Sequence, residues 1–363
     1  MKIEDIKKDL EQYKLSIKEV DELLIEVSWI EHPDLIRELL AYKTEPAKAA
    51  VAVKTEEEIK NEWKTEKKSN GTLKLVSYKG VDEIIEIPEM IGKAKVTELG
   101  DFVFSMKRPR IKKEMKEARA RIKSVIIGDF IKKIGVSAFE GCESLEQITL
   151  PKGIKVLPEK CFAGCLKLKE FVIPETVKKM GDGVFRGCAG LESIMLSSAL
   201  TGIPAYAFEG CIKLKAINLG GNIKKIGCEA FSQCESLSEI IIPEGVCGFP
   251  NRKNGSWAGT FSQCKKLKKV VLPESMTWIG EGVFYGCENL VDINLPKALV
   301  YIDPFAFNGC KKLTDLIIPE TVTMMANGWG APFVGCKNLT LHVKADSYAA
   351  KYAEECNINY VEE

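Results

Sequence analysis

The sequence predicts an α/β repeat solenoid built around a parallel β-sheet and preceded by a small helical segment. Three observations support this fold class. One motif recurs through most of the 363 residues at a period of 23, and self-similarity at such a period is typical of a solenoid. Each copy ends in a short alternating apolar stretch, which indicates a strand. Residues 1–69 do not repeat and space their apolar residues three or four apart, as amphipathic helices do.

Cysteine and phenylalanine mark the period. Nine cysteines follow one another at intervals of 23 residues, with two longer gaps of 30 and 26, and a phenylalanine stands three residues before each of them. A coil of this length cannot bury its own apolar side chains, so we expect them to fill the core of a stack. The predicted core positions are Phe139, Cys142, Phe162, Cys165, Phe185, Cys188, Phe208, Cys211, Phe231, Cys234, Phe261, Cys264, Phe284, Cys287, Phe307, Cys310, Phe333 and Cys336.

A single coil shows how the chain would wind. Ile148, Thr149 and Leu150 alternate, which predicts a strand with Ile148 and Leu150 inward and Thr149 outward. Pro151 ends this strand, and Gly141 before the ladder cysteine permits a tight corner. About ten coils stacked ~4.8 Å apart would pair their strands in parallel and form a body on the order of 50 Å long.

The motif AF-x-GC-xx-L-xx-I-x-LP resembles the BspA-like leucine-rich repeat family over roughly residues 70–363. Residues 70–104 look like that family's first strands and first coil, and residues 347–363 look like its closing helix and terminal strand. The resemblance implies a right-handed leucine-rich-repeat solenoid with a capping helix and strand from about residue 345. Many members are extracellular or surface adhesion proteins of bacteria and some protists, and others have no known role. The resemblance therefore implies binding to macromolecules.

The N-terminal helical segment, residues 1–69, is expected to contain three helices. The spacing predicts one helix over Lys2 to Val27 and another over Asp34 to Tyr42, while Thr55 and Glu58 form a capping box for a third that runs to Trp63. The segment carries 13 basic and 17 acidic residues, a net charge of −4 in a chain whose net charge is +1. It either caps the exposed end of the solenoid or forms a separate docking module.

The first interruption of the repeat is strongly basic. Residues 107–123 hold nine basic residues and two glutamates, a net charge of +7. This basic insertion is either a solvated loop or a contact for an anionic partner, whether an acidic protein, a nucleic acid or a phospholipid surface, and it could also contact the acidic N-terminal helices. The absence of interleaved aromatic residues disfavours nucleic acid. The candidate contact residues are Lys107, Arg108, Arg110, Lys112, Lys113, Lys116, Arg119 and Arg121.

Two later interruptions share one place in the coil. Each adds residues before the repeat phenylalanine, and each contains Asn, Gly and Trp. They would protrude from the same side of the solenoid, where loops held by a rigid frame commonly carry recognition. Alternatively, each tryptophan folds back and fills the gap that its own insertion creates. The candidate binding residues are Arg252, Asn254 and Trp257 in the first loop, and Asn327 and Trp329 in the second.

The outward column of the predicted sheet is the third candidate surface. We use the name outward column for Thr149, Val172, Met195, Asn218, Ile241, Val271, Asn294 and Ile317. Five of these eight are apolar, and the column beside them leans acidic, so the strip is a plausible protein-binding face. The preference of β-branched residues for strands explains the same pattern without any partner. The candidate face residues are Val172, Met195, Ile241, Val271 and Ile317.

Catalytic and metal-binding patterns are not visible in the sequence. The chain has two histidines, His32 and His342, and contains no phosphate-binding glycine loop, nucleophile elbow or zinc-type cysteine pairing. We therefore expect no enzyme activity, cofactor or metal. The ladder cysteines are interpreted as small buried fillers, although stacked cysteines lie within disulfide distance. Four cysteines off the ladder are reactive if they are exposed: Cys161, Cys228, Cys247 and Cys356.

The leading functional hypothesis is a non-enzymatic protein that presents a rigid repeat surface to another protein. One alternative is a bacterial cell-surface adhesin that binds host matrix protein or glycan. The other is an intracellular scaffold that docks through its N-terminal helices. Residues 1–15 are charged and contain no secretory signal, and no apolar run approaches the ~18 residues needed to cross a bilayer. We expect a cytoplasmic protein if Met1 is the native start, and a surface or secreted one if an upstream signal was removed.

Overall fold

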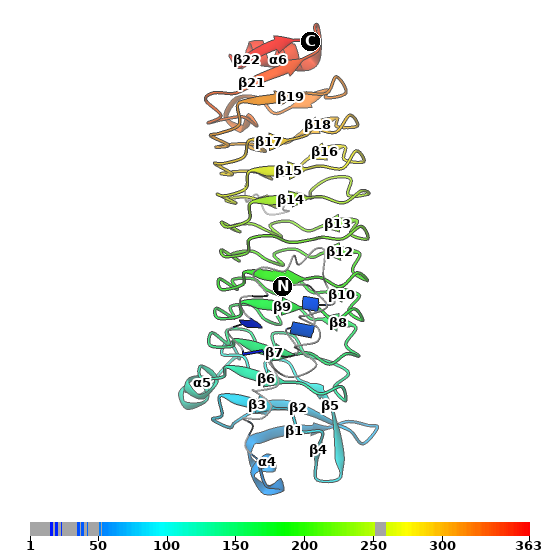
Figure 1. Ribbon diagram of the computed structural model, residues 1–363, viewed down its shortest axis with the longest axis vertical. Helices are drawn as coiled ribbons and strands as arrows, with labels where there is room; N and C mark the ends of the chain where they lie inside the picture. The colour runs from blue at the N-terminus through cyan, green and yellow to red at the C-terminus, as the bar shows by residue number, and fades with distance from the viewer. Residues whose placement is uncertain are drawn as a thin grey trace.

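The computed structural model describes residues 53–250 and 259–363, together with residues 15, 16, 19, 20, 23, 35, 36, 38, 39, 42 and 51. The described residues from 63 onward wind into a β-solenoid of about 12 turns, with parallel strands and few helices (Figure 1). The α/β repeat solenoid expected from the period is therefore confirmed.

A small mixed sheet covers the N-terminal end of the solenoid. Helix α4 (Glu56–Glu62) leads into this sheet, whose strand order is β1-β2-β5-β4. Its strands are β1 (Trp63–Lys67), β2 (Leu73–Tyr78), β4 (Met90–Ile91) and β5 (Ala94–Leu99). Thr55 caps α4 through the predicted capping box with Glu58. The rings of Trp63 and Tyr78 pack on Phe104, so this end of the core is closed by aromatic side chains.

Most coils contribute a strand to the first strand column, in which neighbouring strands pair in parallel. Its outward residues alternate with buried ones, as at Glu239, Ile240 and Ile241. The column comprises β3 (Ile84–Glu86), β6 (Ser124–Ile126), β7 (Gln147–Thr149), β9 (Glu170–Val172), β11 (Ser193–Met195), β14 (Glu239–Ile241), β15 (Lys269–Val271), β17 (Asp292–Ile293), β19 (Asp315–Ile317), β21 (Thr340–Val343) and β22 (Asn359–Glu362).

A second strand column runs beside the first and was not expected from the sequence. Its strands are only two residues long, so they are too short to show an alternating pattern. The column comprises β8 (Val156–Leu157), β10 (Lys179–Met180), β12 (Gly202–Ile203), β13 (Lys225–Ile226), β16 (Trp278–Ile279), β18 (Tyr301–Ile302) and β20 (Met324–Met325). Figure 1 shows the two columns side by side along the length of the stack.

The core is a ladder of phenylalanine rings and cysteine thiols. Successive rings from Phe104 to Phe333 stack with centroids 5.1 to 5.8 Å apart. The predicted corner before each ladder cysteine needs a left-handed backbone, which Gly141 adopts with a φ of 75°. Gln233 and Gln263 take this position in two coils and are held at φ values of 61° and 60°.

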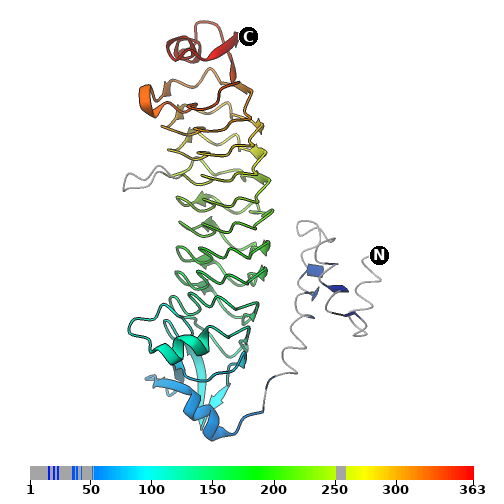
Figure 2. The same cartoon turned by 90° about the vertical axis from the view of Figure 1, so that its left-hand side faces the viewer.

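Other short elements interrupt or end the coils. Helix α5 (Lys113–Arg119) lies in the basic insertion, and a 3₁₀ turn, η1 (Gly328–Gly330), lies in the last interruption. Helix α6 (Tyr348–Glu355) precedes β22 and packs its buried alanines and Tyr352 against the last coil. Figure 2 shows α5 on one flank near the N-terminal end of the stack and α6 at its opposite end.

The expected single helix from Lys2 to Val27 is wrong. Leu15 and Ser16 are not helical, and Ser16 caps a helix that contains Glu19 and Val20. The Glu19 carboxylate accepts from the Ser16 N–H at 2.7 Å, and the Ser16 hydroxyl accepts from the Glu19 N–H at 3.3 Å. This reciprocal cap marks the start of a helix at a point where the apolar spacing of the sequence continues without a break. Of the second expected helix, residues 35, 36, 38, 39 and 42 are described and are helical.

Candidate functional site

The outward column lies on the surface of the first strand column and keeps a fixed register. Val172 pairs with Met195, Ile241 with Val271, and Ile317 with His342. Identical positions of neighbouring coils are therefore stacked at the strand spacing of ~4.8 Å. The frame beneath them is the buried core, so these side chains are presented on a rigid support.

Exposure divides the outward column into two parts. Ile241 and Ile317 expose 67% and 65% of their surface, and Val271 is half-buried. Met195 exposes only 7%, and Val172 is half-buried. The difference between Met195 and the two isoleucines follows from the residues that lie over Met195.

Aliphatic residues of the N-terminal segment lie over Met195 and Val172. Met195 belongs to a cluster of buried side chains that is separate from the solenoid core, and Val172 packs against this cluster from the same face of the sheet. Figure 1 shows the described helical residues of this segment in front of the first strand column, and Figure 2 shows them on that side of the solenoid. The other buried members of the cluster are Val20, Leu23, Leu35, Ile36 and Leu39.

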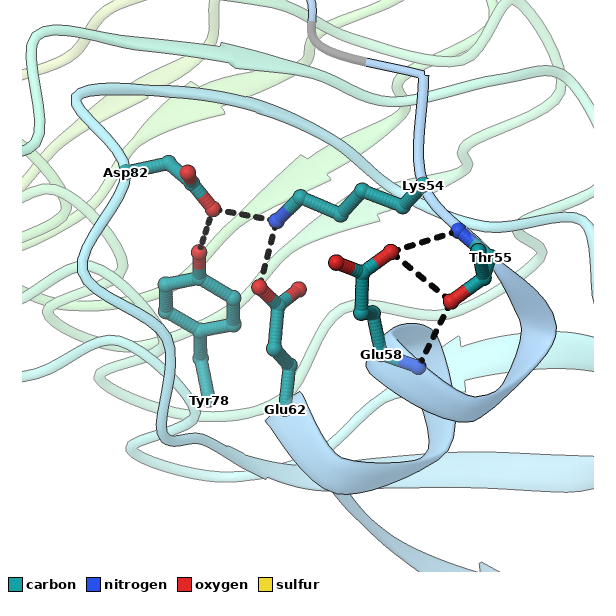
Figure 3. A network of polar contacts seen from close by, with 6 residues as sticks. All are labelled: Lys54, Thr55, Glu58, Glu62, Tyr78 and Asp82. Atoms are coloured by element: carbon teal, nitrogen blue, oxygen red, sulfur yellow. Dashed lines mark hydrogen bonds and ion pairs between the residues drawn. The ribbon is translucent and has the colours of Figure 1, made fainter.

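The end of the solenoid is covered by residues that follow this N-terminal cluster. Lys54 lies between Glu62 of α4, at 2.5 Å, and Asp82, which also accepts a hydrogen bond from the hydroxyl of Tyr78 (Figure 3). Burial alone would raise the pKa of Asp82, but the bonds from Lys54 and Tyr78 hold it below its usual range. This network fixes α4 to the terminal sheet, whereas the described residues between 15 and 42 lie against β9 and β11.

Two asparagines interrupt the apolar character of the outward column. The side chain of Asn294 accepts from the Leu272 N–H at 2.7 Å and donates to the Leu272 carbonyl at 2.9 Å, so it takes the place of a strand neighbour. Asn218 accepts from the Gly220 N–H at 2.9 Å in a coil that has no first-column strand. These asparagines divide the outward column into three parts. Val172 and Met195 are covered by the N-terminal residues, Ile241 and Val271 are not, and Ile317 stands alone.

The acidic column beside the apolar one is partly neutralised. Lys269 pairs with Asp292 at 3.0 Å, and His342 lies 3.4 Å from Asp315 and 2.8 Å from Glu363. Hydrogen bonds to Asp315 and Glu363 raise the pKa of His342. Side chains of this acidic column therefore form ion pairs between adjacent strands and also face solvent.

The basic insertion is anchored to the fold by one of its own arginines. Arg119, at the end of α5, is only 1% exposed and donates to the carbonyls of Ser105, at 2.6 Å, and Tyr78, at 3.3 Å, and to the hydroxyl of Ser77, at 2.9 Å. Burial lowers the pKa of Arg119 to about 10, and the nearby charge of Arg108 acts in the same direction.

The remaining cations of the insertion differ in their availability. Arg108 is half-buried and donates to the Val76 carbonyl at 2.7 Å. Arg119 and Arg108 are therefore used within the fold, so the insertion is neither a wholly solvated loop nor a uniform cationic surface. The exposed candidates are Lys107, Arg110, Lys112, Lys113, Lys116 and Arg121.

The two tryptophan loops are described only in part. Arg252, Asn254 and Trp257 lie outside the described residues. Trp329 occupies the middle of η1, and Asn327 stands before it as an exposed cap residue. The candidate binding role of these five residues stays a prediction.

The ladder cysteines donate hydrogen bonds. All thirteen cysteines lie in the described part of the chain and are free thiols. Each ladder thiol donates to the carbonyl of the phenylalanine in the preceding coil, as Cys188 does to Phe162 at 3.1 Å. Burial raises the pKa of Cys142 and Cys188 to about 12. Off the ladder, Cys161 is buried, Cys228 and Cys356 are half-buried, and Cys247 is exposed.

Two features escaped the sequence analysis. Arg119 looked like any other cation of its insertion, because only the fold reveals its burial. The outward residues of the second strand column also went unrecognised: Trp278, Tyr301 and Met324 are stacked in register. The indole of Trp278 lies over Gly248 and donates to the Phe249 carbonyl at 3.0 Å. The signal for this contact in the sequence was Trp278, a large aromatic residue that follows Thr277 and stands one coil after Gly248.

Metal and membrane sites were sought over the residues that the structure describes. In that part of the chain, no three His, Cys, Asp or Glu side chains gather closely enough to hold a metal ion. None of the described helices combines the length and the apolar character that a bilayer crossing requires.

Comparison with known proteins identifies the repeat. A family model for the BspA type leucine rich repeat region matches residues 110–238 and 257–359 in six copies. No curated protein matched the chain.

Several solved structures are similar to this chain. A leucine rich cell surface protein from Faecalibacterium prausnitzii is 23% identical, covers 83% of this chain and 93% of its own, and has a TM-score of 0.47. A leucine-rich repeat protein from Bacteroides ovatus is 19% identical, with coverage of 86% and 100% and a TM-score of 0.39. The pneumococcal vaccine antigen PcpA is 14% identical, with coverage of 83% and 96% and a TM-score of 0.49. The family model matches more than half of the sequence, and the chain belongs to the BspA-type leucine-rich repeat family.

Proposed function

We propose that this protein is a non-enzymatic binding protein that presents its outward column to another protein. The observation that carries the proposal is the exposure of Ile241 and Ile317, at 67% and 65%, on a sheet whose register is fixed by the stacked core. Aliphatic side chains in such positions lose water-exposed apolar area when a partner covers them.

The support beneath the face favours binding. Ile240 and Leu316 are buried directly under the exposed positions, so the backbone of β14 and β19 is already ordered. A preorganised surface loses less conformational freedom on association than a flexible one does. The acidic flank at Glu239 and Asp315 favours a partner with basic residues beside an apolar stripe.

The family context is consistent with this role. Leucine-rich repeat proteins are typically non-enzymatic, and this chain is related to bacterial cell-surface proteins of the same repeat type. A surface adhesin would use the same face toward a host protein. The binding face is the same in both cases, and identifying the partner would show where the protein is located.

The test compares lysine substitutions on two different faces. The double variant Ile241→Lys and Ile317→Lys places charges on the outward column, and Val156→Lys places one on an exposed position of the second strand column. Proteins captured from an extract of the source organism by immobilised chain would be quantified by mass spectrometry. We expect the double variant to lose proteins that wild type and Val156→Lys retain. The same captured proteins with all three chains would contradict the proposal.

A further inference from the structure

The second strand column carries a row of lysines along its N-terminal half. We use the name lysine strip for Lys132, Lys133, Lys155, Lys178, Lys179, Lys224 and Lys225. They occupy two adjacent positions of the coil, which recur every 23 residues through five successive coils. Seven of these ten positions are lysine, none is acidic, and the other three are Val156, Thr201 and Gly202. The row is therefore a continuous cationic surface.

The lysine strip is straight because its coils are stacked in register. Lys179 pairs with Val156 of the preceding coil, and Lys225 pairs with Gly202. Figure 1 shows β8, β10, β12 and β13 one after another along one side of the stack. Four coil steps at the strand spacing of ~4.8 Å give a strip about 19 Å long and two side chains wide.

The charges of the lysine strip are exposed and are not neutralised by carboxylates. Lys132 donates to the Asp129 carbonyl at 2.7 Å, and Lys224 donates to the Glu244 carbonyl at 2.7 Å, so both keep their full charge. In the part of the chain that the structure describes, the other five lysines form no ion pair. All seven side chains are exposed to solvent.

Lysines elsewhere on the solenoid are paired between coils. Lys215 lies 2.6 Å from Glu192, and Lys311 lies 2.9 Å from Glu288, each one coil away. The lysine strip contains no such carboxylate, although like charges on neighbouring strands repel one another. An anion laid along the strip would remove this repulsion, so the surface is suited to a negatively charged ligand.

The composition of the lysine strip indicates which kind of polyanion it fits. A lysine is a flexible point charge without the planar fork of arginine, so the strip responds to the density of anionic groups. It has no aromatic side chain on which nucleic-acid bases could stack. Its one apolar side chain is Val156, 46% exposed, which is far less than the apolar core of a protein interface or of a membrane-inserted face. A linear polysaccharide with sulfate or carboxylate groups requires only the charges.

We propose that the lysine strip binds a linear anionic polysaccharide, aligned with the long axis of the solenoid so that its sulfate or carboxylate groups lie over successive coils. The strip belongs to the second strand column, whereas the outward column belongs to the first. The inference therefore goes beyond the proposed function and does not depend on it.

The first test measures the binding of two defined oligosaccharides by isothermal titration calorimetry. One is a sulfated heparin octasaccharide, and the other is a carboxylated galacturonic acid octasaccharide. We expect at least one of them to bind wild type in low salt and to bind more weakly as the salt concentration rises. The strip variant, Lys155→Gln with Lys178→Gln and Lys179→Gln, should bind it at least ~10-fold more weakly. Circular dichroism checks that the variant keeps the strand content of wild type.

The matched control removes the same number of charges from the basic insertion. Lys112→Gln with Lys113→Gln and Lys116→Gln should leave the affinity within twofold of wild type. Position 156 gives a second comparison, because it lies within the lysine strip. Val156→Lys should tighten binding at least ~3-fold, and Val156→Glu should weaken it.

A second measurement needs no substitution. The lysines of wild type would be acetylated with a succinimidyl ester, with and without the bound octasaccharide, and their modification rates compared by mass spectrometry. We expect slower modification at both ends of the lysine strip, at Lys133 and Lys225, and at Lys178 between them. Lys112 and Lys113 of the basic insertion should react at an unchanged rate.

Four outcomes would overturn the inference. They are the absence of binding by both octasaccharides, equal losses in the strip variant and the insertion variant, protection confined to the insertion, and tighter binding of another polyanion through the lysine strip. The last would be tested with oligothymidylate, polyglutamate and phosphatidylserine vesicles, which stand for a nucleic acid, an acidic protein and a membrane. The strip variant should still capture the proteins that depend on Ile241 and Ile317, so the proposed function and this inference can fail separately.

Discussion

At the scale of single residues, Arg119 shows how a charge can become part of a core. The sequence indicates a basic insertion with a net charge of +7, and the exposed lysines fit that expectation. Arg119 could not be separated from them, because its burial depends on Ser77 and Ser105 meeting the end of α5. Those contacts join segments 14 and 42 residues away along the chain.

Replacing Arg119 with lysine should destabilise the fold although the charge is kept. A lysine has no planar fork with which to reach Ser105, Ser77 and Tyr78 together, and it leaves some of these buried acceptors without a donor. We expect a loss of about 2–3 kcal/mol in the free energy of unfolding, measured by urea denaturation. Lys112→Ala, on the exposed side of the insertion, is the control and should change stability by less than ~0.5 kcal/mol. Equal effects of the two would show that Arg119 has no anchoring role.

The cysteines were only partly predictable. Their period correctly indicated repeated core positions, and Cys165 and Cys211 are fully buried. Their hydrogen bonds to phenylalanine carbonyls could not be inferred, because a sulfur–oxygen distance between neighbouring coils depends on the offset of the stack. The bond adds a directional contact to what composition alone describes as a small apolar filler.

Thiol labelling should separate the cysteines by exposure. Cys247 is exposed, whereas the ladder thiols are buried, and burial raises the pKa of most of them, such as Cys188, and keeps these protonated. We expect one fast-reacting thiol with an aromatic disulfide reagent in the native protein and reaction of the ladder only after unfolding. Cys247→Ser should remove the fast phase. A fast phase that survives this substitution would assign it to another cysteine.

At the scale of elements, local patterns predicted the first-column strands and the helix cap better than the second-column strands. The first-column strands and the Thr55–Glu58 cap were recognisable because each has a period or a motif. The strands of the second column recur at the same 23-residue period, but each has only two residues, which is too short to show the alternation of a strand. The motif of Ser16 and Glu19 was present in the sequence, but the continuous apolar spacing around it suggested one uninterrupted helix.

The last strand should loosen as the pH rises. Hydrogen bonds to Asp315 and Glu363 raise the pKa of His342 above its ordinary value of 6.5. The protonated ring therefore stabilises the folded state fully below pH 6.5, and this contribution is lost as the pH rises through the higher folded-state pKa. Because Glu363 follows β22, we expect residues 359–362 to exchange their amide hydrogens faster at pH 8.5 than at pH 6, after correction for intrinsic rates.

The control for this pH effect is His342→Gln. Glutamine can keep a hydrogen bond to either carboxylate and does not titrate. The corrected exchange of β22 should then be the same at both pH values. Equal pH dependence in the variant and in wild type would place the titrating group elsewhere.

At the scale of the whole molecule, the sequence predicts the stack but not how its non-repeating part is arranged. Repetition fixes the solenoid because each coil meets only its neighbours. The apolar spacing of Val20, Leu23 and Leu39 indicates that these side chains are buried against another surface, and any apolar surface could bury them. Their position over Met195 depends on a long-range contact. The sequence therefore left open whether this segment caps the end of the solenoid or forms a separate docking module, and it did not indicate the face of the sheet.

The continuity of the ring ladder leads to a prediction about how the molecule unfolds. Phe208 lies near the middle, with ring centroids 5.7 Å from Phe185 and 5.3 Å from Phe231. Phe208→Ala should cost about 3–5 kcal/mol locally and weaken the coupling between the two halves of the stack. We expect urea unfolding to separate into two transitions, with hydrogen exchange increasing first in the coils around residue 208.

The matched control lies at the end of the same ladder. Among the described side chains, Phe333 stacks on one ring, that of Phe307 at 5.6 Å, so Phe333→Ala removes a terminal contact and leaves the rest of the array continuous. Its unfolding should stay a single transition, with faster exchange confined to the C-terminal coils. A single transition with uniformly faster exchange in Phe208→Ala would show that coupling extends beyond neighbouring coils. The solenoid would then behave as one cooperative unit, and binding at Ile317 would change the stability of the coil around Met195 through the coupled stack.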